Sequence, residues 1–225
     1  MNEANRVLVV AAHADDEVLG CAGAIARHVA EGHRVQVVLL ADGVTARTCA
    51  QAEELQSRES AAARAHAILG VSKTIHLGLP DNRLDTLPLL DVVKPLEAII
   101  EEFRPYLVYT HHHGDLNVDH RVALHAVMTA CRPLPGSSVK EIRCFEVLSS
   151  TEWNAPAFAA FQPNLFVDIS PYLDRKLAAL QAYEEEMRAV PHSRSIVHAE
   201  ILARHRGHCV GLAAAEAFVL ARGIC

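Results

Sequence analysis

Short apolar runs alternate with amphipathic stretches along the first half of the chain. Arg6 to Ala12 reads RVLVVAA, a run without polar alternation, which is typical of a strand buried on both faces of a sheet. Val18 to Ala30 has apolar residues at helical spacing, and Gly32 is a suitable stop for that helix. The same patterns predict strands at 34–41, 74–79 and 106–110, and helices at 49–69, 87–103 and 119–131. Strands that alternate with helices indicate parallel βαβ units.

The pattern is weaker after Cys131. Residues 141–148 and 164–169 are predicted strands, and Ser170-Pro171 offers an N-cap and a first residue for a helix that ends near Arg188. Pro95 is expected to disturb the helix at 87–103. No repeat or linker divides the chain, so we expect a single domain over residues 1–225. The predicted fold class is α/β, an open, mostly parallel Rossmann-like sheet with helices on both faces.

Composition and charge narrow the classes of partner. The net charge of -6 gives no basic surface for nucleic acid, and no basic cluster indicates binding to anionic lipid. The apolar run at 7–12 is too short for a signal peptide or a stable membrane insertion. The six cysteines form no CxxC pair, so we expect reduced thiols and a cytoplasmic location. The sequence leaves the oligomeric state open, a homo-oligomer included.

Polar residues suited to metal binding follow the first and the fourth predicted strand. The first strand leads into His13-Ala14-Asp15-Asp16, and the fourth leads into the segment 111–120, which contains four histidines. In an open parallel sheet, ligands bind beyond the carboxyl ends of the strands, where the strand order reverses. A doubly wound order makes these two strands neighbours at that point. We therefore expect a metal site at the carboxyl ends of strands 1 and 4.

Three side chains are the candidate ligands. A catalytic zinc ion takes three protein ligands and keeps a fourth position for water. His13 and Asp16 stand three residues apart where a loop enters a helix, and His120 at the head of the later helix is placed to supply the third ligand. Zn²⁺ is the expected cofactor, although the same donor set suits Fe²⁺. Zinc lowers the pKa of bound water from about 15.7 to about 7, and Asp15 is the candidate general base.

Each motif has a plainer interpretation when taken alone. Asp15, Asp16 and Glu17 also suit a helix N-terminus, where the helix dipole favours acidic side chains. The run His111 to His113 suits residues that orient ligands through their second ring nitrogen. The joint placement of both loops at strand ends favours the metal site.

The segment AHADDEVLGCAGAIA resembles the N-terminal signature of the LmbE-like, or PIG-L, family of zinc-dependent N-deacetylases. Residues 115–120 resemble that family's second motif. The likeness continues through Arg58-Glu59, Leu69-Gly70, residues 79–81, 191–195 and 215–218, and so extends over nearly the whole chain. The resemblance implies His13, Asp16 and His120 as metal ligands and Asp15 as the base. It implies a small-molecule N-acetylated sugar conjugate as substrate, deacetylated at its N-acetylglucosamine unit.

Two residues depart from the family pattern. Ala14 replaces a proline, and Asn117 stands where many members carry a histidine that stabilises the oxyanion or protonates the leaving amine. An asparagine amide can donate a hydrogen bond to an oxyanion, but it cannot supply a proton. The candidate general acids are therefore Asp15, one of His111 to His113, or His192.

Two arginines are candidate substrate contacts. Arg58 and Arg194 carry guanidinium groups that suit carboxylate, phosphate or sugar oxygens. For Arg58, an ion pair with a nearby glutamate on a helix surface is the alternative. Tyr109 and Trp153 are expected in the core.

Three other functions compete with sugar deacetylation. A nucleotide-binding oxidoreductase of doubly wound type would need GxGxxG after the first strand, where this chain has an acidic run. A metal-binding relative without turnover is favoured only by Asn117. An amidase that acts on a thiol or antibiotic conjugate fits the same motifs.

Overall fold

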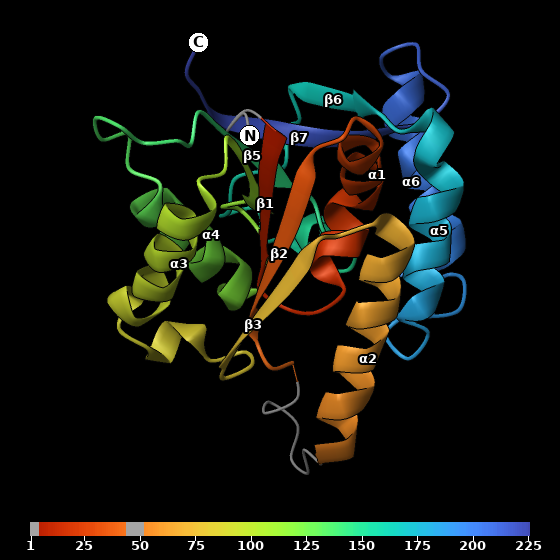
Figure 1. Ribbon diagram of the computed structural model, residues 1–225. Helices are drawn as coiled ribbons and strands as arrows, with labels where there is room; N and C mark the ends of the chain where they lie inside the picture. The colour runs from red at the N-terminus through yellow and green to blue at the C-terminus, as the bar shows by residue number, and fades with distance from the viewer. Residues whose placement is uncertain (1–4, 44–51) are drawn as a thin grey trace.

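Seven strands form one sheet at the centre of the computed structural model, which describes residues 5–43 and 52–225 (Figure 1). The strands are β1 (Arg6–Ala11), β2 (Arg34–Ala41), β3 (Lys73–Leu79), β4 (Leu107–His111), β5 (Glu141–Phe145), β6 (Leu165–Asp168) and β7 (Ala215–Gly223). Their order across the sheet is β3-β2-β1-β4-β5-β7-β6, and only the pairs that contain β7 are antiparallel. The order reverses between β1 and β4, which lie side by side. The predicted α/β fold with a mostly parallel sheet is confirmed.

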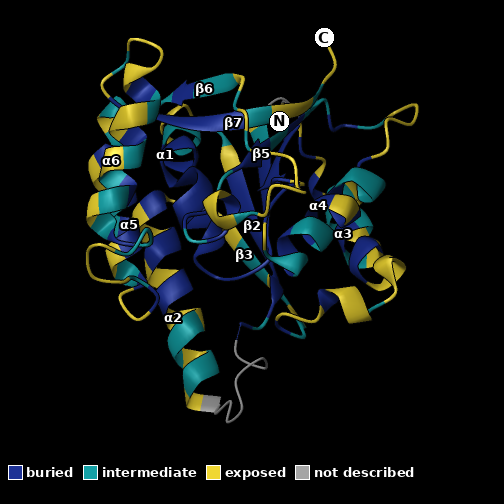
Figure 2. Cartoon of the chain, turned by 180° about the vertical axis from the view of Figure 1, so that it is seen from behind, coloured by how far each residue is buried: buried dark blue, intermediate teal, exposed yellow. Residues whose placement is uncertain are grey.

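Helices cover both faces of the sheet (Figure 1). One face carries α1 (Asp16–Ala30), α2 (Ala52–Leu69), α5 (Leu173–Ala182) and α6 (Ile196–His208), and the other carries α3 (Leu89–Phe103) and α4 (Val118–Ala130). Val7 and Val9 of β1 belong to the first core, whereas Leu8 and Val10 belong to the second. Burial on both faces explains the continuous apolar run of β1. Figure 2 shows the buried residues of the chain in dark blue. None of the described helices has the length and apolarity needed to cross a bilayer.

Several predicted helix boundaries and features are wrong. α3 continues through Pro95 without interruption. The helix expected from Ser170 to near Arg188 begins at Leu173, after a 3-10 turn, and ends at Ala182. The Ser170 hydroxyl does not cap it, because it donates to Asp168 at 2.6 Å. The described part of α2 begins at Ala52, so the expected start at residue 49 lies outside the described residues.

Two elements near the C-terminus were not predicted. The helix α6 follows the loop 191–195, and the strand β7 inserts between β5 and β6. β5 ends at Phe145, three residues earlier than predicted. The described cysteines are free, and Cys21, Cys131 and Cys144 among them are buried.

A buried ion pair closes a break in α1. The backbone leaves the helical conformation at Cys21 (φ -148°). Beyond the break, the N–H groups of residues 23 and 24 donate to the Glu216 carboxylate at 2.9 and 2.7 Å. Before the break, the Leu19 carbonyl accepts from the Lys176 ammonium at 2.8 Å, and the two charged groups pair at 2.6 Å. Side chains from β7 and α5 therefore provide hydrogen bonds to these buried backbone groups on the two sides of the break.

Candidate metal centre

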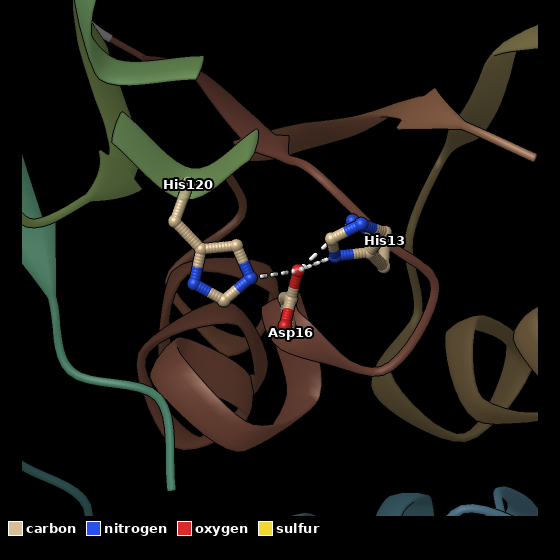
Figure 3. Close-up of side chains that lie close together, drawn as sticks. All are labelled: His13, Asp16 and His120. Carbon is tan, nitrogen blue, oxygen red and sulfur yellow. Dashed lines mark hydrogen bonds and ion pairs between the residues drawn. The ribbon is translucent and has the colours of Figure 1, made fainter. Parts of the chain in front are cut away.

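The two ligand-rich loops converge because β1 and β4 are parallel neighbours. Val9 of β1 lies opposite Tyr109 of β4, so both strands end at the same edge of the sheet. Figure 3 shows the outcome: His13, Asp16 and His120 point toward one another. Asp16 Oδ2 lies 3.2 Å from His13 Nδ1 and 3.2 Å from His120 Nε2.

The donor set fits a metal ion. One ligand atom from each of His13, Asp16 and His120 lies within 4.8 Å of the others, and all three residues are buried. Ligand bonds of about 2.0–2.2 Å place neighbouring donors of a tetrahedral ion roughly 3.5 Å apart, close to the observed separations. Two imidazoles and one carboxylate are a donor set for zinc or ferrous iron.

Asp16 and its two histidines hold opposite charges. Burial alone would raise the pKa of Asp16, but the charge of His120 and the hydrogen bonds from both histidines hold it well below its usual range. Burial would lower the pKa of His120, and the charge of Asp16 with the hydrogen bond to Asp115 raises it to about 9. Burial would also lower the pKa of His13. Its hydrogen bonds, of which the one to Asp119 has the largest effect, instead hold this pKa well above its usual range. The cluster therefore provides an ionised carboxylate for a cation, and protons compete with metal for the imidazoles.

Asp115 orients His120. Its Oδ1 lies 3.1 Å from His120 Nδ1, which leaves Nε2 directed at Asp16. Asp115 in turn accepts hydrogen bonds from the hydroxyls of Ser150 and of Thr151, the latter at 2.6 Å. Burial raises the pKa of Asp115, but the hydrogen bond and charge of His120 outweigh it and lower the pKa to about 2. Such a carboxylate fixes the ring orientation of a ligating histidine.

Asp81 and Asp119 hold the second nitrogen of His13. His13 Nε2 lies 3.1 Å from Asp81 Oδ1 and 3.2 Å from Asp119 Oδ2, so these three residues form an overlapping candidate cluster. The Asp119 carboxylate already accepts the backbone N–H groups of Asn82 and Leu84 at 2.7 and 3.0 Å. With both oxygens of Asp119 engaged, the cluster around Asp16 is the better metal site.

Of the three histidines at the end of β4, His111 contacts the candidate ligand His120. The ring of His111 stacks on that of His120 at 3.9 Å, and its Nε2 accepts the N–H of Ala12 at 2.8 Å. Burial lowers the pKa of His111 to about 3, so this ring is neutral. His112 accepts the N–H of Gly114, and His113 is exposed. His111 therefore stacks on the candidate ligand His120, and its Nε2 also lies 3.6 Å from Asp16 Oδ2.

Asp15 has an unusual backbone conformation. Its φ of 117° lies in the region that favours glycine, at a cost of about 1–3 kcal/mol. Its N–H donates to Glu17 Oε2 at 3.1 Å, and the buried Glu17 is held by His66 Nε2 at 3.0 Å and the Tyr183 hydroxyl at 2.7 Å. Arg194 Nη1 lies 2.9 Å from Asp15 Oδ2. Burial raises the pKa of Asp15 to about 7, although the charge of Arg194 opposes that rise.

A polar cavity of about 260 Å³ opens over these residues. Asn117 lines it and begins α4: its Oδ1 accepts the N–H of Asp119 at 2.8 Å, and its Nδ2 donates to Asn82 at 3.1 Å. Arg58 pairs with Glu186 from the segment after α5, and not with a local glutamate. The lining residues are His13, Asp15, Asp16, Gly43, Arg58, Asp81, Asn82, Asn117, His120, Ser149, Ser150, Glu186 and Arg194.

His192 does not appear among the described lining residues of this cavity. Its Nδ1 accepts the N–H of Arg194 at 3.0 Å, and its ring packs edge-on against Trp153 with centroids 5.5 Å apart. Trp153 is 51% exposed, so the prediction that it lies in the core is wrong. The prediction for Tyr109, which is fully buried, is confirmed.

The supporting carboxylates were not identified from the sequence. Asp115 and Asp119 lie in the segment 115–120 that contains His120, and Asp81 ends the segment 79–81 that also resembles the family. Membership of these segments was the available signal. Glu17 was interpreted only as a helix-start residue. Its contacts with α2 and with the segment after α5 depend on tertiary packing that no local pattern encodes.

Comparison with known proteins finds relatives over most of the chain. Residues 8–131 match the family described as PIG-L, GlcNAc-PI de-N-acetylase. The uncharacterized deacetylase YaiS of Escherichia coli K12 is 31% identical over 189 residues, which cover 81% of this chain and 92% of that protein. The 1D-myo-inositol 2-acetamido-2-deoxy-alpha-D-glucopyranoside deacetylase of Mycobacteroides abscessus is 26% identical over 265 residues, covering 97% of this chain and 92% of that protein.

The fold also occurs in a protein named for a different reaction. The crystal structure of the 4-carboxy-2-hydroxymuconate hydratase of Pseudomonas putida KT2440 superposes with a TM-score of 0.78 at 23% identity and covers 98% of each chain. That likeness concerns the fold. The family match includes both loops of the metal centre and more than half of the sequence. The chain therefore belongs to the PIG-L, or LmbE-like, family.

Proposed function

We propose that this chain is a zinc-dependent N-deacetylase that hydrolyses the acetamido group of an N-acetylglucosamine conjugate. The observation that carries the proposal is the position of Asp15: an anchored carboxylate that lines the same cavity as His13, Asp16 and His120. Zinc is proposed from the donor set, which suits Fe²⁺ as well. The names of the deacetylase relatives support the reaction and the sugar.

Asp15 is the proposed general base. Zinc, when bound, would lower the pKa of water and polarise the amide carbonyl of the substrate. Arg194 fixes one oxygen of the Asp15 carboxylate at the cavity wall, so the group is held in place to accept the proton of the attacking water. The strained backbone at Asp15, fastened by Glu17, aims this side chain into the cavity.

Asn117 is the proposed oxyanion donor. One N–H of its side-chain amide is used by Asn82, which leaves a second N–H for the developing oxyanion. Because the amide cannot release a proton, we assign protonation of the leaving amine to Asp15, which gains a proton in the first step. His192 is the second candidate, since it lies beside Arg194.

Arg58 and Arg194 are proposed substrate contacts. Both line the cavity, and both are already paired with carboxylates, Glu186 and Asp15. Each guanidinium has five N–H donors, so a sugar hydroxyl can be bound while the ion pair is kept. An acidic substrate group would instead have to compete with these carboxylates, which favours an uncharged sugar ring at this wall.

Acetate release tests the proposal. Zinc-loaded protein is incubated with the methyl and benzyl glycosides of N-acetylglucosamine, the inositol conjugate, and an N-acetylated thiol conjugate, and both acetate and free amine are measured. We expect equal amounts of both products from the sugars, and release slowed by about 10²–10⁴ with Asp15→Asn. Turnover of the thiol conjugate alone would identify an amidase of another class.

A second arm tests hydration, the reaction for which a structural neighbour is named, and metal binding without turnover. The protein is offered 4-carboxy-2-hydroxymuconate, and loss of the conjugated double bond is followed by absorbance. Hydration without acetate release from any sugar would replace the proposed reaction. Full zinc occupancy with no turnover of any compound would indicate a metal-binding relative without catalysis.

A further inference from the structure

The cavity is too small to enclose a whole sugar conjugate. Its volume of about 260 Å³ lies below the roughly 300–1,000 Å³ of pockets that enclose drug-sized ligands. Every described lining residue except Gly43 has a polar side chain. The part of a conjugate beyond the acetamido sugar therefore has to rest outside, on the residues around the opening.

An exposed tryptophan lies three residues from the cavity-lining Ser150. Trp153 ends the 3-10 turn η3 (Thr151–Trp153), and its backbone N–H donates to the carbonyl of the cavity-lining Ser150 at 3.2 Å. Two hydrogen bonds hold the turn in place: Glu152 accepts the backbone N–H of Ser149 at 2.6 Å, and the Thr151 hydroxyl donates to Asp115. The indole is thus carried by a segment fixed to the metal centre.

The side chain of Trp153 contacts His192 and remains about half exposed. His192 packs against Trp153 in an edge-on arrangement with ring centroids 5.5 Å apart, and the backbone N–H of Arg194 donates to His192. Trp153 is 51% exposed in spite of this contact. Leaving a large aromatic surface in water sacrifices the stabilisation that burial would give, so an open indole on a fixed support marks a binding position.

A second apolar group borders the same loops. Leu116 and Phe158 are exposed, and the Arg121 guanidinium, which donates to the Leu116 carbonyl, lies 4.8 Å from the Phe158 ring centre. The loop that carries Phe158 touches the metal-centre loop, because a Cβ added at Gly114 would meet a backbone oxygen of that loop at 1.8 Å. Leu116 directly precedes the cavity-lining Asn117, so exposed apolar side chains lie on and beside the loop that leads into the cavity.

We infer that Trp153 is a stacking platform for the ring that a substrate carries next to its N-acetylglucosamine unit. The inference rests on the proposed function and names its substrate class: conjugates whose neighbouring group presents a flat apolar face. Both an aryl group and the C–H face of a second pyranose have this chemistry. Methyl glycosides, which lack such a face, are the poorer substrates.

Discrimination between substrates tests the platform. The value of kcat/KM is measured for the benzyl glycoside, N,N'-diacetylchitobiose and the methyl glycoside of N-acetylglucosamine. In Trp153→Ala we expect the benzyl-to-methyl ratio to fall by about threefold to tenfold, as for loss of one aromatic stacking contact, and Trp153→Phe to restore most of it. If the chitobiose-to-methyl ratio of kcat/KM falls equally in Trp153→Ala, the platform binds sugar rings as well.

The control is Leu134→Ala. Leu134 is 62% exposed and precedes β5, so it lies at the opposite end of the parallel strands from the cavity. Its ratios should match those of the unmodified protein. Ratios that do not change in Trp153→Ala, for either ring-bearing substrate, would overturn the inference.

Fluorescence provides a readout that does not depend on turnover. Trp153 is the sole tryptophan of the chain, so emission excited at long wavelength reports on this one side chain. Asp15→Asn is titrated with the benzyl and methyl glycosides, and we expect saturable quenching or a blue shift only with the first. Emission that does not respond at saturation would overturn the platform. A response without acetate release from the unmodified protein would retain the platform and refute the proposed reaction.

Discussion

Asp15 and Asp16 are adjacent carboxylates with different partners. Asp16 faces two histidines, whereas Asp15 faces Arg194. Asp15→Asn should keep its metal and lose about 10²–10⁴ in kcat, the usual cost of removing a general base. Asp16→Asn should lose metal affinity first. Elemental analysis and acetate assays of both variants separate these effects.

Two outcomes would contradict the roles assigned to Asp15 and Asp16. If Asp15→Asn turned over at near the unmodified rate with full metal content, another group would accept the proton. If Asp16→Asn kept its full metal content, the overlapping cluster of His13, Asp81 and Asp119 would become the better candidate site.

His28 makes stability depend on pH. Burial, followed by the charges of His33 and Arg143, lowers its pKa in the folded state to about 4, below the unfolded value of 6.5. Its partners are the Tyr109 hydroxyl at 3.0 Å and His33 at 2.9 Å, with Glu31 also nearby. As the pH falls from 6.5 toward 4, the unfolded chain binds a proton that the folded chain refuses, so stability declines.

The prediction is a loss of about 1–3 kcal/mol across that pH window from this residue alone. Urea unfolding at several pH values measures it. In His28→Gln the decline between pH 6.5 and 4 should be shallower. The matched control His125→Gln, at an exposed position of α4, should follow the unmodified protein. Parallel curves for all three proteins would show that His28 is not responsible.

At the scale of elements, the broken helix α1 depends on Glu216 and Lys176. Glu216→Gln should destabilise the protein by about 3–5 kcal/mol, because it leaves the buried Lys176 ammonium without its counter-charge. Glu200→Gln is the matched control, since Glu200 pairs with Arg204 on the surface of α6 and such pairs contribute about 0–1 kcal/mol. Urea denaturation midpoints compare the two. Equal, small losses would mean that the buried pair does not maintain the fold.

Elements with strong periodicity were predictable, and elements without it were not. β1 and β2 are apolar on both faces, so their sequence has one interpretation. The helix α6 was not predicted, because its large apolar residues Val197 and Ile201 are exposed. The stripe that faces the core consists of the small residues Ala199, Ala203 and Gly207. The strand β7 is antiparallel and pairs with strands distant in sequence, which local patterns do not encode.

Some site residues were likewise predictable from local motifs, and others were not. The three candidate ligands stand in two short motifs after β1 and β4, so their convergence followed from topology. The second contact of His13 comes from Asp81, which follows β3 at the far edge of that half of the sheet. The exposure of Trp153 depends on a 3-10 turn fixed by Glu152, and residue type alone predicted burial.

At the scale of the whole molecule, metal should stabilise the fold. An ion bound only by the folded chain adds about 2.7 kcal/mol at a free concentration one hundred times its Kd. Adding zinc to chelator-treated protein should raise its Tm by several degrees, as measured by calorimetry. His120→Ala should show little response. A rise of the same size in His120→Ala would mean that the stabilising ion binds elsewhere.

The pairing of β1 with β4 also sets the order of events during synthesis. His13 and Asp16 leave the ribosome more than one hundred residues before His120. The emerging chain therefore has only two of the three ligands until α4 has been made and β4 has joined β1. Zinc should be captured late, after the sheet has formed. The ion would then slow unfolding far more than it accelerates folding, because its contacts are absent from an early transition state.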